Sequence, residues 1–114
     1  MKAETLKGHL DGLLLATLEG EPKHGYAIIQ ALYAGSGGQV DLPTGTVYPA
    51  LRRLETAGLV RGNWSVVGGR RRRVYQLTGA GRRSLKAERN TWQEVASTID
   101  ALLGASAQSA GGQT

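Results

Sequence analysis

The sequence contains no cysteine, which excludes a disulfide scaffold, a thiol nucleophile and a zinc site built on cysteine ligands. It also lacks a long apolar run, because the longest such stretch near its start, residues 13–18, is far too short to span a bilayer. Glu4 and Asp11 interrupt the preceding segment, which argues against a secretory signal. We therefore expect a cytoplasmic protein that does not enter the membrane.

Signatures of catalysis and of metal or phosphate binding are missing too. His9 and His24 have no partners at metal-ligand spacing. The glycine-rich segment at residues 35–38 lacks the Gly-Lys-Ser/Thr that completes a phosphate-binding loop, and it lies between two helical patterns. Serine, histidine and aspartate occur without a nucleophile signature. The sequence thus predicts a protein that is not an enzyme and has no cofactor and no metal.

The basic residues are concentrated in one part of the chain, whose 114 residues suit a single domain with a modest core. Residues 51–89 hold eleven basic and two acidic residues, a net charge of +9. The remaining residues hold three basic and seven acidic ones, a net charge of −4. This asymmetry indicates a basic face, which is typical of proteins that bind phosphate backbones. A solvated charge run that serves only solubility is the alternative.

Apolar spacing predicts three helices in the first half of the chain. Leucines recur at helical spacing over residues 3–18, and a second amphipathic pattern covers residues 25–33. Thr44 is a suitable N-cap for a third helix, which ends at Gly58 as its C′ glycine. The residues expected to point inward from this third helix are Val47, Leu51 and Leu54.

A β-hairpin is predicted after these helices. Two extended runs, at residues 60–67 and 70–77, are separated by two glycines, a pattern typical of a tight hairpin turn. A two-residue turn places Trp64 opposite Arg73, where a cation–π contact is geometrically reasonable. The tip, with four arginines at residues 70–73, is expected to be exposed.

The last predicted helix runs from near Thr78 to about residue 103 and carries apolar residues at heptad a and d spacing. Glu88 is the one polar break in this seam, which indicates a pairing helix. Trp92 either packs within the seam or lines a ligand cavity, and the sequence leaves both interpretations open. The seam consists of Leu85, Trp92, Val95, Ile99 and Leu102.

Three helices followed by a hairpin with a basic tip are the order of a winged helix-turn-helix. We therefore predict a mainly α fold with a small β-hairpin and an added C-terminal dimerisation helix. Residues 1–78 form the DNA-binding domain, residues 79–103 the dimerisation helix, and residues 104–114 a disordered tail with nothing to bury.

The third helix is the candidate reader of the DNA major groove. Its exposed first turns carry hydroxyl, phenol and guanidinium groups with no acidic residue before Glu55, and N–H groups at a helix start favour an anion. An ordinary helix whose Tyr48 packs on its own surface is the alternative. The candidate DNA contacts are Thr44, Gly45, Thr46, Tyr48, Pro49, Arg52 and Arg53 of this helix and Arg70, Arg71, Arg72 and Arg73 of the hairpin.

Three motifs carry a family resemblance. GTVYPALRRLE at residues 45–55, followed by AGLV at residues 57–60, resembles the recognition-helix signature of PadR-family regulators. HGYAI at residues 24–28 resembles the opening of that family's second helix, and GRRRRVYQLT at residues 69–78 resembles its wing. The match runs from about residue 6 to residue 103. The short C-terminal helix makes the chain similar to the compact subgroup of the family.

The resemblance implies a homodimeric repressor of a neighbouring transporter or detoxification gene, and at times of its own gene. Such proteins bind dyad-symmetric operators in double-stranded DNA, often of ATGT…ACAT character, and are nucleoid-associated when bound. Some compact members hold flat aromatic compounds between tryptophans of the last helix, and others respond to phenolic acids. Family members dimerise through the last helix with help from the first, which adds Leu6, Leu10 and Leu14 to the seam as candidate dimerisation or ligand contacts.

Two other functions remain open for a basic winged helix. One is a module that binds an acidic protein partner, and the other is a nonspecific DNA-binding protein. Sequence preference separates both from a repressor, because a repressor favours its own site over random DNA by about 10³-fold or more.

Overall fold

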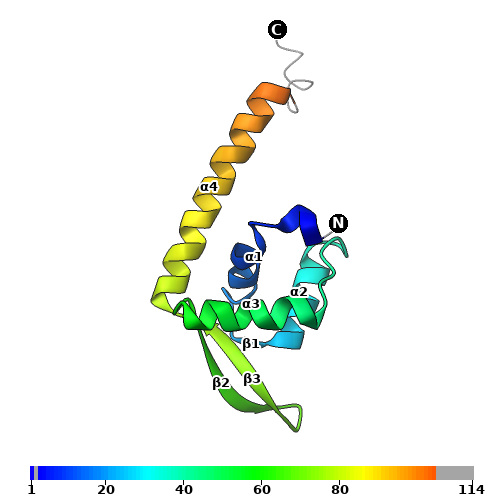
Figure 1. Cartoon of the computed structure of the whole chain (residues 1–114), viewed down its shortest axis with the longest axis vertical. Coiled ribbons are helices and arrows are strands. Elements are labelled where there is room, and N and C mark those ends of the chain that lie inside the picture. The colour runs from blue at the N-terminus through cyan, green and yellow to red at the C-terminus, as the bar shows by residue number, and fades with distance from the viewer. Residues whose placement is uncertain (2, 105–114) are drawn as a thin grey trace.

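The computed structural model describes residue 1 and residues 3–104. Three helices form a body from which a β-hairpin and a long last helix extend in opposite directions (Figure 1). This architecture confirms the prediction of a mainly helical winged helix-turn-helix fold with a small hairpin. In chain order the elements are η1 (Ala3–Leu6), α1 (Leu10–Thr17), β1 (Lys23–His24), α2 (Gly25–Gly35), α3 (Thr44–Thr56), β2 (Val60–Val67), β3 (Arg70–Leu77) and α4 (Gly79–Leu103).

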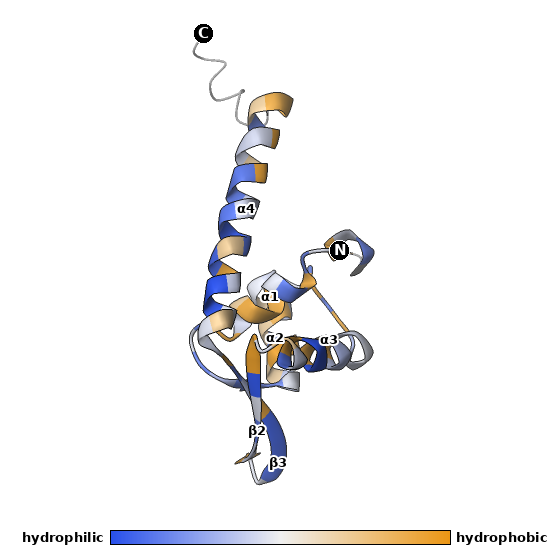
Figure 2. Ribbon diagram, turned by 60° about the vertical axis from the view of Figure 1, so that its left-hand side comes forward, coloured by the Kyte–Doolittle hydropathy of each residue, from blue (hydrophilic) through white to orange (hydrophobic). Residues whose placement is uncertain are grey.

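The core lies where α1, α2 and α3 meet, and it is built almost entirely from leucine, isoleucine and valine. The root of the hairpin contributes Val60 and Leu77, and the first turns of α4 contribute Leu85. Burial of these aliphatic side chains is the main favourable term that holds the helices together. Apolar colour gathers in the body, while the hairpin and much of α4 are hydrophilic (Figure 2).

The start of the chain differs from its prediction. A continuous helix over residues 3–18 was wrong, because the structure has a 3₁₀ turn at Ala3–Leu6 and an α-helix that begins only at Leu10. Gly8 lies between them with φ of +90°, a left-handed conformation that interrupts an α-helix. The leucines on both sides of the break still pack against the core, which explains why their spacing resembled one helix.

The second and third helices lie where the spacing placed them, with two changes at their ends. α2 continues to Gly35, two residues beyond the predicted end. The N-cap of α3 is Pro43 in an extended conformation, so Thr44 is the first helical residue and not the cap. Gly58 follows the helix with φ of +78°, as predicted for a C′ glycine.

The hairpin has the predicted register. Val67 pairs with Arg70 and Trp64 with Arg73 across a two-residue turn whose glycines both have positive φ. Sequence reasoning missed the third strand, β1, which pairs with β3 and gives the sheet order β1-β3-β2. A strand of two residues is too short to produce an alternating pattern.

The last helix begins as predicted at Thr78, whose hydroxyl accepts a hydrogen bond from the Gly81 amide at its N-cap. It ends at Gly104, which has φ of +71° and caps the helix. The rest of the predicted tail, residues 105–114, lies outside the described residues. No helix in the described part of the chain is long and apolar enough to cross a membrane.

Candidate nucleic-acid interface

Helix α3 has one buried face and one exposed face. Gly45, Pro49 and Arg52 are exposed, and Thr46 is half-buried at the edge of the exposed face. The hairpin extends away from the body below α3 (Figure 1), and Tyr48 of α3 lines one hollow together with residues of the hairpin. The buried face consists of Val47, Ala50, Leu51 and Leu54.

Tyr48 lies between these two faces and contacts the first residue of α2. Its side chain is 45% exposed. Its ring lies directly over buried Gly25, where an added Cβ atom would overlap ring carbon Cε1. Tyr48 therefore packs on a neighbouring helix, in contrast to the alternative in which it covers its own helix surface, and half of its ring stays accessible.

His24 caps helix α2. Its Nδ1 atom accepts a hydrogen bond of 3.2 Å from the Ala27 amide, which satisfies one of the free N–H groups at the helix start. Burial, and to a smaller extent the nearby charge of Arg72, lowers the pKa of His24. Both causes favour the neutral ring that the cap requires. Among the described residues, no group of three or more histidine, aspartate or glutamate side chains could hold a metal ion.

The four arginines of β3 alternate between the two faces of the hairpin. Arg71 and Arg73 lie on the face of Trp64, with guanidinium carbons 4.9 Å and 5.7 Å from the centre of its ring. The predicted contact between Trp64 and Arg73 is therefore confirmed, and Arg71 joins it. Arg70 and Arg72 belong to the opposite face.

Two of the predicted DNA contacts already have carboxylate partners. Arg73 pairs with Glu55 at 2.5 Å and joins the wing to α3, while Arg53 pairs with Asp11 at 2.5 Å and joins α3 to α1. The Arg53 pair links residues 42 positions apart, for which the sequence carries no signal. Within the part of the chain that the structure describes, none of the following makes an ion pair: Arg52, Arg70, Arg71 and Arg72.

The predicted seam of the last helix divides into two parts. Leu85 and Leu14 are 4% and 0% exposed in the core of the single chain, where neighbouring side chains already cover them. Leu6 and Leu10 are half-buried against the same core. Four apolar side chains farther along α4 stay 41–80% exposed, and we call them the apolar stripe: Trp92, Val95, Ile99 and Leu102.

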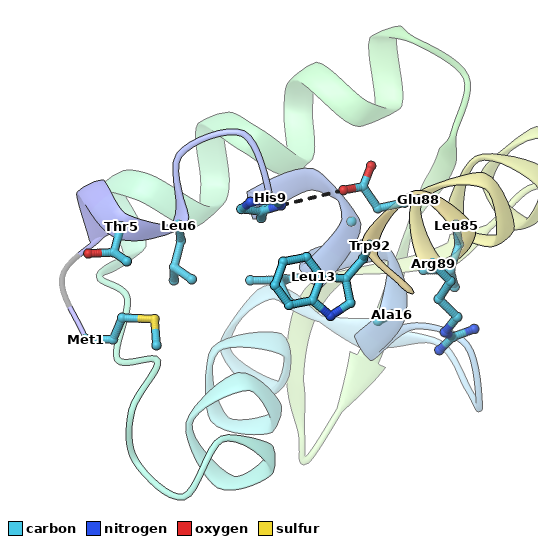
Figure 3. A pocket seen from close by; sticks show the side chains of 11 residues that line it. Met1, Thr5, Leu6, His9, Leu13, Ala16, Leu85, Glu88, Arg89 and Trp92 are labelled. Atoms are coloured by element: carbon cyan, nitrogen blue, oxygen red, sulfur yellow. Dashed lines mark ion pairs between the residues drawn. The ribbon is translucent and has the colours of Figure 1, made fainter. Parts of the chain in front are cut away.

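A groove of about 520 Å³ lies between η1, α1 and α4 (Figure 3). Its walls are largely apolar, with Leu13 at its base and Trp92 on the α4 side. The His9 ring meets Trp92 edge-on at 5.7 Å, and its Nδ1 atom lies 3.8 Å from Glu88. Glu88, the polar break in the predicted seam, therefore faces α1 and supplies a carboxylate to the groove.

The sequence profile of the transcriptional regulator PadR-like family matches residues 14–87. The chain belongs to this family. The resemblance seen in the sequence motifs is thereby confirmed, and with it the prediction of a transcriptional regulator in place of an enzyme. The matched region includes the second half of α1, all of α2 and α3, the wing and the first turns of α4.

Individual relatives agree with this assignment. Transcriptional regulator Rv3488 of Mycobacterium tuberculosis is 44% identical over 70 residues, which are 61% of this chain and 63% of that protein. The PadR-like regulator BC4206 of Bacillus cereus is 27% identical with a TM-score of 0.78, covering 89% of this chain and 97% of its own. A PadR family regulator of Eggerthella lenta is 31% identical with a TM-score of 0.75, covering 90% and 88%. The chain is therefore a PadR-like transcriptional regulator with a winged-helix DNA-binding fold.

Proposed function

We propose that this PadR-like regulator is a homodimeric repressor that binds a dyad-symmetric operator and is released by a small aromatic or phenolic effector. It controls a neighbouring transporter or detoxification gene, and its own gene where the operator overlaps that promoter. The repressor works in the cytoplasm and is nucleoid-associated while it is bound. Residues 1–78 bind the DNA and residues 79–103 hold the two chains together.

The observation that carries the proposal is the pairing of a polar, basic α3 face with an arginine-rich wing. The only carboxylate on α3, Glu55, is neutralised by Arg73, so no free negative charge on this helix opposes a phosphate backbone. The first turns of α3 offer Thr44, Gly45, Thr46, Tyr48, Pro49 and Arg52 to the major groove, and the wing offers Arg70, Arg71 and Arg72 to flanking phosphates. Arg53 and Arg73 keep their pairs with Asp11 and Glu55 and contact DNA through their remaining N–H groups.

The apolar stripe supports the homodimer. Its side chains repeat at heptad spacing and remain 41–80% exposed in the single chain, which is costly for an isolated helix in water. Pairing with the same stripe of a second copy would bury them. Two α3 helices would then enter successive major grooves, about 34 Å apart.

The groove beside Trp92 supports the effector. It opens next to the apolar stripe, so an occupant contacts the helices that pair the two chains. An aromatic molecule that prefers one dimer geometry would change the spacing of the α3 helices, and the mismatch would weaken all DNA contacts together. Leu6 of η1 lines this groove, and Leu10, the first residue of α1, packs against the core.

The test is a binding titration of the purified protein against its own upstream region and against a scrambled duplex at two salt concentrations. We expect two chains per duplex and a preference of about 10³-fold or more for the upstream region. Equal, weak binding to both duplexes would contradict a repressor and support a nonspecific DNA-binding protein. Absence of binding to either duplex would point to an acidic protein partner.

A further inference from the structure

A hollow of about 250 Å³ lies between α3 and the inner face of the wing. We call it the wing hollow. No acidic residue is among its lining side chains in the described chain. The side chains that decide its chemistry are Tyr48, Trp64, Arg71, Arg72, Arg73 and Tyr75.

The wing hollow carries two positive charges that no ion pair in the described chain neutralises, those of Arg71 and Arg72. Arg73 is paired with Glu55, whereas Arg71 has no carboxylate partner among the described residues. Its guanidinium carbon lies 4.9 Å from the centre of the Trp64 ring. Stacking on an indole restrains a long side chain that would otherwise lose rotamer entropy on binding an anion.

Two tyrosines line the same hollow as Arg71 and contribute hydroxyl groups to it. Burial raises the pKa of Tyr75, and the charge of Glu55 raises it further, so its hydroxyl keeps its proton and can donate a hydrogen bond. Tyr48 faces the hollow from α3, with its ring resting on Gly25. A guanidinium and two hydroxyl donors around a concave site match an oxyanion with several acceptor oxygens.

We propose that the wing hollow seats one phosphate group of the DNA backbone, bound by the Arg71 guanidinium and by the hydroxyls of Tyr48 and Tyr75. The inference rests on the proposed function, which brings DNA to this surface. A helix in the major groove lies beside the phosphates that border the groove, and the wing hollow adjoins the exposed face of α3. An acidic peptide has no such reason to approach at this position.

Gly25 is a positioning residue for this site. It contacts no DNA in the proposal, but only a residue without a Cβ atom leaves room for the Tyr48 ring. Any larger residue would push the phenol out of the wing hollow. Gly35, at the other end of α2, has no atom within 4 Å of an added Cβ, so the same substitution there displaces nothing.

The first measurement compares Gly25→Ala with Gly35→Ala. We expect Gly25→Ala to weaken binding about tenfold to both the upstream and the scrambled duplex, because a phosphate contact carries no sequence information. Gly35→Ala should bind like the unmodified protein. Equal affinities of the two variants would overturn the proposal. A thermal melt of each variant shows whether it is folded.

The second measurement does not depend on the folding of Gly25→Ala. Arg71→Ala removes the unpaired charge that lies on Trp64 and leaves that of Arg72, while Arg61→Ala removes an exposed arginine from the outer face of the same hairpin. We expect the slope of log K against log salt to become shallower by about one for Arg71→Ala and to stay unchanged for Arg61→Ala. The same slope in both variants would contradict a phosphate at Arg71.

A double variant tests whether the residues form one site. If Tyr48 and Arg71 hold the same phosphate, Gly25→Ala together with Arg71→Ala should lose little more affinity than the weaker-binding single variant. Fully additive losses would mean two separate contacts and would overturn the shared site.

A last experiment distinguishes a DNA phosphate from free inorganic phosphate as the ligand of the wing hollow. Inorganic phosphate replaces chloride at equal ionic strength. Because free phosphate and a DNA phosphate would compete for the same donors, we expect it to weaken duplex binding of the unmodified protein more than that of Arg71→Ala. Calorimetric binding of phosphate that requires Arg71 but leaves the duplex affinity unchanged would mean that the occupant is the free anion and that the assignment to DNA is wrong. If the protein shows no preference for the upstream region, the repressor proposal fails. The slopes of log K against log salt on the scrambled duplex still test whether the wing hollow binds a phosphate.

Discussion

Helices α3 and α4 are both amphipathic, yet only α3 has its whole apolar face covered within a single chain. The apolar face of α3 is covered by α1, α2 and the root of the hairpin, with Val47 and Leu51 fully buried. On α4 the same kind of pattern is covered only at Leu85, and Ile99 and Leu102 remain 45% and 80% exposed. An apolar pattern thus predicts which face of a helix will be buried, but not which chain will bury it.

This difference separates the tasks of the two helices. The exposed face of α3 is polar and basic and suits a charged partner such as DNA. The exposed face of α4 is apolar over its distal half and suits a second copy of the same helix. In Figure 1 the distal half of α4 extends away from the body, on the side opposite to the hairpin, so one chain can use both helices at once.

The largest effect should come from charging the apolar stripe. We expect Ile99→Asp to weaken dimerisation at least 100-fold, because a buried, unpaired charge costs about 3–5 kcal/mol. Sedimentation equilibrium measures the dimer constant. Ser97→Asp places the same charge on the other side of α4 and should leave it unchanged. A dimer that survives Ile99→Asp would show that the chains pair elsewhere.

Leu85→Ala separates the buried start of α4 from its exposed end. Removing a side chain that is 4% exposed should lower the free energy of unfolding by about 2–5 kcal/mol. Leu102→Ala should change it by less than about 0.5 kcal/mol when both are measured by denaturant unfolding in the monomeric Ile99→Asp background. Similar losses at both positions would mean that the distal helix also packs within one chain.

Tyr48→Ala tests the exposed side of α3. We expect binding to the upstream duplex to fall about tenfold or more, because the phenol is lost from the DNA-facing surface, while the thermal midpoint stays near that of the unmodified protein. Fluorescence anisotropy and a thermal melt measure the two quantities. A midpoint that collapses together with affinity would identify Tyr48 as a core residue.

The smallest effect concerns the pH dependence of stability through His24. The lowered pKa of His24 means that the folded state favours the neutral ring. The stabilisation by this cap is therefore complete above the pKa of histidine in the unfolded chain, about 6.5. It is lost as pH falls through the folded-state pKa. We expect the thermal midpoint to fall by a few degrees between about pH 7.5 and pH 5.5. In His24→Asn, which keeps a capping side chain, the fall should be smaller, and parallel curves for the two proteins would contradict this role.

Several elements could be predicted because neighbouring residues determine them. Gly68 and Gly69 tolerate the positive φ that a two-residue turn demands, and this turn sets the register that pairs Trp64 with Arg73. Thr78 supplies a hydroxyl to the amide three residues later, which starts α4. In each case the cause and the effect lie within a few residues of each other.

Other features depend on contacts between distant segments. The strand β1 exists because Lys23 and His24 lie beside β3, some fifty residues later in the chain. Gly25 is needed because the ring of Tyr48 arrives from α3. The residues around β1 and Gly25 carry no pattern that predicts β3 or Tyr48 as their contacts.

By itself the sequence determined the order of helices and hairpin, the basic wing and the membership of a family of regulators, since these follow from short-range periodicity, turn chemistry and motifs. The tertiary structure decided that Leu14 and Leu85 belong to the core and not to the exposed seam. It also decided that Arg53 and Arg73 are held by carboxylates, and that Arg71 is not. The physical reason is that burial and ion pairing depend on which surfaces meet in space. Helical spacing predicts which residues share a face, but it does not predict which segment packs against that face.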